Sequence, residues 1–322
     1  MKALKFFSIL SSLLIATLYS CSKEDTLVLE DKFYTVSLKF NGDITTVDSP
    51  LTRGTATDDL YGLMVWQDGS FFGGGLYDNL EDMKVRLQAT KKYKFAVTIV
   101  KNGKNFIYKT YDGSYSYPFA YEERTGGNTY KIIRTPISNK LNAFNEKHYD
   151  FFKYGLSQMA ENLERRYNPE TDRYYGEIEN YTPTKNGTVN IELKRTAFGL
   201  QYKVSGVSDG TFTINIKRGD ETFFSKSDIT ADYTSDPKII TFHNVYSAWL
   251  YGDNYTEEVE ISASWARGIG INQDLGTKTI IVKRNKMNII HINLTTDESG
   301  NNLGIDLDSE TMDNESVTIP FG

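Results

Sequence analysis

The sequence predicts an all-β protein with two tandem β-sandwich domains and one amphipathic helix in the first. Three observations lead to this prediction. The 322 residues include 22 Tyr and 18 Phe but only 7 Pro, and aromatic residues favour half-buried strands over helices. Short apolar runs recur along the chain between turn residues, which is typical of a sandwich. The chain is also about twice as long as a usual single domain.

Residues 1–21 have the pattern of an export signal. Lys2 and Lys5 form a basic start, and the apolar run that follows, residues 6–18, is too short to span a bilayer comfortably. Cys21 is the only cysteine, so the chain can form neither an internal disulfide nor a cysteine-based metal site. The alternative is an ordinary secretory signal in which the cysteine is incidental.

The sequence Leu-Tyr-Ser-Cys at residues 18–21 resembles a bacterial lipobox. In that motif the cysteine thiol receives a diacylglyceryl group, so the resemblance implies that Cys21 is lipidated and begins the mature chain. Acyl chains at about 0.8 kcal/mol per buried methylene make such an anchor practically permanent. Residues 22–25 resemble the signal that sends lipoproteins of the Bacteroides group to the outer face of the outer membrane, with a solvated linker as the alternative. Residues 22–32 are expected to be a polar tether.

The first domain is expected over residues 33–187. Residues 34–40 alternate apolar and polar side chains, which predicts a strand with one apolar face. Residues 45–59 lack periodicity and contain Arg53, so we expect an exposed loop. The glycine-rich run at 70–75 lacks the residues of a phosphate-binding loop and is interpreted as a flexible turn. Further strands are predicted at 60–66, 85–89, 93–100, 105–111 and 129–134.

One helix is predicted near the end of this domain, because apolar residues recur there at every third or fourth position. Its stripe consists of Tyr149, Phe152, Leu156, Met159, Leu163 and Tyr167. Such a stripe more often packs on a sheet than binds a partner. Residues 168–187 contain proline, asparagine and glycine, so we expect the domain junction near their end.

The second domain is expected over residues 188–322. Arg218-Gly219-Asp220 falls where a hairpin turn is needed. The acidic residues between 297 and 310 do not match the spacing of an EF-hand, which favours a solvated loop over a calcium site. Val317, Ile319 and Phe321 share one face of an alternating segment. Strands are predicted at 189–193, 197–204, 211–217, 238–245, 257–265, 278–282 and 287–294.

The composition and the motifs argue against several classes of function. The net charge is −6 and becomes 34 − 42 = −8 without Lys2 and Lys5, whereas nucleic-acid binding needs a basic face. The three histidines, His148, His243 and His291, are not at metal-ligand spacing, and no hydrolase motif is present. Three pairs of adjacent acids, Asp58-Asp59, Glu122-Glu123 and Glu257-Glu258, could in principle serve glycoside hydrolysis. Adjacent acids on a strand, however, usually point to opposite faces. We therefore expect no enzyme activity, no cofactor and no metal.

Four pieces of sequence, in this order, resemble fimbrillin-type lipoproteins of the Bacteroides group, which are the subunits and anchors of type V pili. The resemblance implies two β-sandwiches in tandem, a place in a fimbrium at the outer membrane surface, attachment through the lipid on Cys21, and other pilus subunits as partners. The four pieces are the lipobox; the first strand with SPLTRGT at 49–55 and DDLYG at 58–62; VNIELKRTA at 189–197; and VKRNKM at 282–287.

The resemblance also implies a way of assembly. In such subunits a trypsin-like protease cuts after an arginine in the first loop, and the matching residue here is Arg53. Loss of strand 34–40 would expose backbone groups and an apolar trough, which a strand from a neighbour fills by β-augmentation. Val317, Ile319 and Phe321 are spaced to act as that donor strand. The alternatives are an uncut Arg53, a segment 316–321 that closes its own sandwich, and a permanent pilus anchor.

A surface glycan-binding lipoprotein is a second possible function of a different class. Its stacking residues would be Trp66, Trp249 and Trp265. Burial of these side chains in the core is the competing interpretation. The sequence names no host ligand.

Overall fold

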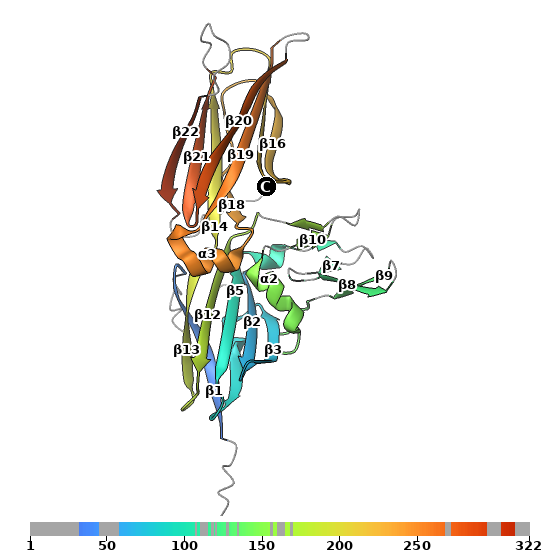
Figure 1. Cartoon of the computed structure of the whole chain (residues 1–322), viewed down its shortest axis with the longest axis vertical. Helices are drawn as coiled ribbons and strands as arrows, with labels where there is room; N and C mark the ends of the chain where they lie inside the picture. The colour runs from blue at the N-terminus through green and yellow to red at the C-terminus, as the bar shows by residue number, and fades with distance from the viewer. Residues whose placement is uncertain are drawn as a thin grey trace, which may run out of the picture.

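The computed structural model describes residues 32–44, 58–106, 108–109, 115–116, 119, 121–126, 129–133, 135–154, 157–159, 165–167, 170–267, 272–294 and 304–312. The fold is mostly β, as predicted. In Figure 1 one large sheet lies in the lower half and strands β14 to β22 lie in the upper half, with the short helices α2 and α3 at mid-height. In the described part of the chain, no helix is long and apolar enough to cross a membrane.

The lower half is a seven-stranded sheet that curls around one core. Its strands, in spatial order, are β3 (Ser70–Tyr77), β2 (Leu60–Gln67), β5 (Tyr93–Val100), β12 (Arg173–Tyr181), β13 (Gly187–Arg195), β1 (Phe33–Gly42) and β4 (Lys84–Gln88). β1 runs parallel to β13 and antiparallel to β4. Leu63 in β2, Val85 in β4 and Val189 in β13 belong to one buried cluster, so strands that are distant in the sheet face each other across the core.

The glycine-rich run at 70–75 is not a flexible turn, and that prediction is wrong. β3 pairs with β2 along its length, and segment 137–144 crosses over it. The N–H groups of Ala143 and Phe144 donate to the carbonyl oxygen of Gly74 at 3.1 and 3.0 Å. A Cβ atom on Gly75 would lie 1.9 Å from the Lys140 carbonyl oxygen. The glycines therefore allow two backbones to approach closely.

The predicted helix over residues 149–167 is also wrong in length. α2 spans only Tyr149–Lys153, and Tyr154 is extended, with φ −117° and ψ 169°. Met159 and Tyr167 lie in the hairpin of β10 (Ser157–Met159) and β11 (Arg165–Tyr167), while Leu156 and Leu163 lie outside the described residues. At the end of the helix the Arg173 guanidinium donates to the carbonyl oxygens of Phe151 and Tyr154, which satisfies groups that have no partner within the helix. Phe152 packs on the large sheet as expected.

The upper half has two sheets that share one buried cluster. In one, β14 (Ala197–Ser205) pairs with β17 (Tyr233–Thr234), with β18 (Lys238–Thr241) and, in parallel, with β21 (Lys286–Asn293), which also pairs with β22 (Gly304–Thr311). The other has the order β16 (Glu221–Ile229), β15 (Thr211–Arg218), β19 (Thr256–Ala266) and β20 (Asn272–Lys283). The turn predicted at Arg218-Gly219-Asp220 is confirmed, with Gly219 at φ +55°.

Two segments without a predicted strand contain one. β12 crosses the middle of the large sheet, within residues 168–187, where we expected the domain junction near the end. β22 occupies part of the expected acidic loop, because residues 304–311 alternate and pair with β21. The strand predicted at 238–245 stops at Thr241, since Asn244 caps α3 (Val245–Tyr251) by accepting the Ser247 N–H at 2.8 Å.

The change from the lower sheet to the upper ones comes at Thr196. β13 was expected to open the second half, but it pairs with β1 and β12 of the seven-stranded sheet. The smaller elements are the hairpins β6 (Tyr108–Lys109) with β7 (Tyr115–Ser116) and β8 (Tyr121–Gly126) with β9 (Thr129–Ile133), and the 3₁₀ turns η1 (Leu80–Asp82), η2 (Gly103–Asn105), η3 (Glu146–His148) and η4 (Gly252–Asn254).

Candidate functional site

The candidate site is the slot that β1 occupies between β13 and β4. Val36, Leu38 and Phe40 point into the core and are nearly fully buried, whereas Lys39 is exposed. β13 pairs with β1 from Val36 to Gly42, and β4 pairs with it from Phe33 to Ser37. The slot thus offers two backbone edges and three apolar sites at alternate positions of a strand.

Apolar burial and hydrogen bonding both hold β1 in place. Each of the three core side chains contributes about 1.5–3 kcal/mol when buried. An empty slot would leave the facing N–H and C=O groups of β13 and β4 without ladder partners, which is costly in a sheet. Another strand of the same pattern would therefore be favoured over an empty slot.

The end of β1 is fixed by a polar contact at the junction of the two halves. The Asp43 carboxylate accepts the backbone N–H of Arg195 at 2.9 Å and pairs with the guanidinium of Arg284, which lies in the turn between β20 and β21. The Asp43 N–H donates to the Leu193 carbonyl oxygen at 2.9 Å. Gly42 precedes it at φ +96°, where a Cβ would lie 2.4 Å from that same oxygen.

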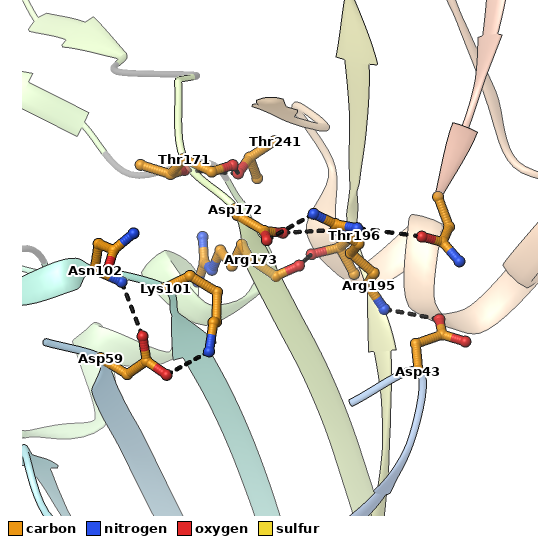
Figure 2. A network of polar contacts seen from close by, with 11 residues as sticks. Asp43, Asp59, Lys101, Asn102, Thr171, Asp172, Arg173, Arg195, Thr196 and Thr241 are labelled. Atoms are coloured by element: carbon orange, nitrogen blue, oxygen red, sulfur yellow. Dashed lines mark hydrogen bonds and ion pairs between the residues drawn. The ribbon is translucent and has the colours of Figure 1, made fainter. Parts of the chain in front are cut away.

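Figure 2 shows the polar network around this contact. Arg195 donates from Nε and Nη2 to the two carboxylate oxygens of Asp172, both at 2.7 Å. Burial on its own lowers the pKa of Arg195, but the charges of Asp172 and Asp43 raise it by more. The guanidinium therefore stays charged inside the junction, and Asp172 uses both its oxygens on this one partner.

The segment that contains Arg53 is anchored at both of its ends. Asp43 holds one end, as described above. At the other end Asp59 is buried and accepts hydrogen bonds from Lys101 Nζ at 2.6 Å and from the Asn102 N–H at 2.9 Å (Figure 2). The loop expected at 45–59 thus starts and ends at charged, well-fixed residues.

The functional residues predicted from the sequence lie outside the described residues. These are Cys21, Arg53 and the proposed donor positions Val317, Ile319 and Phe321. Lipidation, cleavage and strand donation therefore stay predictions. The junction residues Asp43, Asp172, Arg195 and Arg284 were not predicted from the sequence. Two of them stand in the segments that carry the family resemblance, Arg195 in 189–197 and Arg284 in 282–287, so the charges inside those motifs were the available signal.

The three tryptophan side chains are buried or partly buried. Trp66 and Trp265 are only 7% and 4% exposed, which confirms core burial for both. The Trp265 indole N–H donates to the Asp209 carbonyl oxygen at 2.7 Å. Trp249 is partly buried against the Tyr175 ring, with the centroids 5.5 Å apart. Trp66 and Trp265 therefore offer no open stacking face.

Glu257 and His148 have structural partners. The Glu257 carboxylate accepts hydrogen bonds from the Arg218 guanidinium and from the backbone N–H of His243. No group of three or more possible metal ligands lies together among the described residues. His148 is fully buried, accepts the Asn145 N–H at 3.0 Å and stacks on Phe144 at 4.7 Å.

His148 predicts a dependence of stability on pH. Burial lowers its pKa from 6.5 to about 4, so between these values the unfolded chain binds a proton that the folded chain does not. Stability is therefore lost as the pH falls from about 6.5 to about 4, by about 3 kcal/mol from this residue. Urea denaturation at pH 7 and pH 4.5 should show a smaller pH difference for His148→Gln than for the native chain. His243→Gln, at an exposed site, is the control, and an equal difference in all three proteins would contradict the prediction.

No protein-family model matches the sequence, and no curated protein matches it. Solved structures do match. They include the fimbrial anchor protein Mfa2 from Porphyromonas gingivalis (9% identity, 88% of this chain and 99% of that chain covered, TM-score 0.41). They also include a fimbrial assembly protein from Parabacteroides distasonis (13%, 89% and 98%, TM-score 0.33) and a C-terminally truncated tip fimbrial protein Mfa3 from Porphyromonas gingivalis (10%, 87% and 99%, TM-score 0.33).

Fimbrial proteins are thus among the solved structures to which this chain is similar at low sequence identity. The sequence motifs resemble the same group. With TM-scores below 0.5, the match carries no residue, site or partner over to this chain. The proposals below are built on the residues of this chain alone.

Proposed function

We propose that this protein is a pilus component of the bacterial cell surface that assembles by strand exchange. Lipid on Cys21 holds it to the outer membrane, cleavage after Arg53 frees the segment that contains β1, and a strand from another subunit takes the slot. The chain has two β-sandwich domains: residues 33–195 contain the slot, and residues 197–312 form the upper half. Separate buried clusters in the two halves support this division.

One observation supports the proposal above the others: the strand in the slot and a distal segment share a pattern. β1 carries VSLKF at residues 36–40, and residues 317–321 read VTIPF. Both place valine, a branched aliphatic residue and phenylalanine at alternate positions in the same chain direction. The three apolar sites that accept Val36, Leu38 and Phe40 would accept Val317, Ile319 and Phe321 in the same order.

Pro320 takes the place of Lys39 in this alignment. A proline has no N–H and forfeits at most one ladder hydrogen bond, about 1 kcal/mol. Lys39 lies beyond the part of β1 that pairs with β4, which ends at Ser37. The loss is small beside three apolar sites of about 1.5–3 kcal/mol each.

Assembly tests the proposal. After tryptic cleavage the purified chain should gain a new N-terminus at Gly54 and form a ladder of oligomers that survives mild denaturant. Ile319→Asp should abolish the ladder, because an unpaired carboxylate in an apolar site costs several kcal/mol. Thr318→Asp is the control, since its side chain lies on the opposite face of the strand.

Two outcomes would overturn strand donation. If the native chain is cut and stays monomeric at high concentration, the protein is a pilus anchor that does not exchange strands. A chain that unfolds when residues 313–322 are deleted would show that this segment closes its own sandwich.

A further inference from the structure

The junction beside the end of β1 contains the guanidinium of Arg284. The Arg284 side chain is only 9% exposed, and its guanidinium donates to Asp43 and to the Arg195 carbonyl oxygen at 3.4 Å. Its Nε is buried and has no hydrogen-bond partner within the described residues. Asp43 is the partly buried counter-ion for this guanidinium, with a side chain that is 25% exposed, and it lies on the segment that strand exchange would remove.

The other acids nearby cannot replace Asp43. Asp172 already uses both carboxylate oxygens on the Arg195 guanidinium. Asp253 pairs with Arg284 at 2.6 Å, but its side chain is 84% exposed, so water screens that pair. Lys194 adds a further positive charge, with its Nζ 3.2 Å from the Trp249 carbonyl oxygen. Without Asp43 the junction keeps its cations, and the remaining ion-pair partner of Arg284 among the described residues is the exposed Asp253.

We propose that the Arg284 guanidinium and the Arg195 backbone N–H form a carboxylate socket, which Asp43 fills in the intact chain and which selects an acidic residue on any strand that replaces β1. The proposal rests on the strand exchange proposed above. It adds a fourth recognition element to the three apolar sites. The preferred partner is a strand with apolar residues at alternate positions and a carboxylate three residues beyond the last of them, as in VSLKFNGD at residues 36–43.

The socket makes the slot select its strand by an acidic residue as well as by the pattern of apolar residues. Within residues 313–322 the acids Asp313 and Glu315 precede the apolar positions, whereas Asp43 follows them. In the same-direction alignment they would lie at the opposite end of the slot from Arg284. We therefore expect a strand with the acid of β1 to hold the slot more tightly than one that matches only its apolar residues.

Peptide exchange in a nicked full chain tests the socket. A site-specific protease sequence placed within residues 45–57 allows the chain to be cut while β1 stays bound. Labelled peptides of residues 33–44, with Asp43 or with Asn in its place, then compete for the slot. The native peptide should bind tenfold to a hundredfold more tightly, as expected for a close charged pair with a buried guanidinium. Lys39→Gln in the same peptide is the control and should bind like the native peptide.

The partner residue is tested by the same exchange. In a chain with Arg284→Gln the two peptides should bind alike, whereas Arg267→Gln, at a surface ion pair, should preserve the difference. Hydrogen exchange of β1 in the uncut chain is the second measurement, and Asp43→Asn should raise it at least about tenfold. Equal binding of both peptides, or a difference that persists in Arg284→Gln, would overturn the socket.

The socket and the assembly reaction can fail separately. A chain that forms no oligomers but distinguishes the two peptides would keep the socket and overturn strand donation between subunits. A chain that forms oligomers but binds both peptides equally would keep strand donation and overturn the socket.

Discussion

Replacing Phe40 with alanine is expected to lower the free energy of unfolding by about 3–5 kcal/mol. Phe40 is 1% exposed and lies opposite Ile191 of β13. The change removes most of the apolar area of that site and leaves a cavity that the curled sheet cannot fill. Urea denaturation at pH 7 measures the loss, and hydrogen exchange shows whether β1 opens before the rest of the chain.

Lys39→Ala is the matched control, because this side chain points to solvent from the same strand. It should change the free energy of unfolding by no more than about 0.5 kcal/mol. Equal losses in the two variants would mean that the apolar sites do not hold β1. A Phe40→Ala chain that is cut after Arg53 should also release its β1 segment faster than the native chain.

The strands that could be predicted are those with regular alternation. β1, β2, β5, β15 and β19 bury every second residue or nearly every residue, so their side chains show the period of a strand or a continuous apolar run. This signal is local, and it needs no knowledge of the partner strand. It also predicted β1, although the idea that another strand replaces β1 came from the family resemblance.

The elements that could not be predicted depend on contacts from distant residues. β3 contains glycines because segment 137–144 lies against it. α2 stops after five residues although an apolar stripe of helical period continues, because Arg173, from a strand that follows later in the chain, binds its last carbonyls. In both cases a tertiary contact overrides the local pattern.

The contacts at the junction could not be predicted for the same reason. Asp43 and Arg284 meet although 241 positions separate them in the sequence, and each alone is an ordinary charged residue at the end of a strand. Only the pairing of β1 with β13 brings the two ends together. Strand β1 could thus be predicted from periodicity and its exchange from the family resemblance, whereas the charged pair at its end required the fold.

Replacing Arg173 with methionine is expected to cost about 3–5 kcal/mol, because each buried oxygen left without a hydrogen-bond donor costs about 1–3 kcal/mol. Arg173 is fully buried in β12. Its guanidinium donates to Thr98 Oγ1 at 2.8 Å and to the Tyr154 carbonyl oxygen at 2.7 Å, and it also binds the carbonyl of Phe151. Methionine fills similar volume but leaves these oxygens without a donor.

Lysine should not rescue the loss, because a single ammonium cannot reach oxygens on three sides as a planar guanidinium does. Arg86→Met, at an exposed position of β4, is the matched control and should cost no more than about 0.5 kcal/mol. Urea denaturation measures both, and near-UV circular dichroism should show loosening of the aromatic cluster under α2. A loss below about 1 kcal/mol for Arg173→Met would mean that packing of Phe152, and not the guanidinium, ends and holds the helix. Because α2 covers the outer face of the large sheet while the slot opens to its inner core, a folded Arg173→Met chain should still bind the β1 peptide.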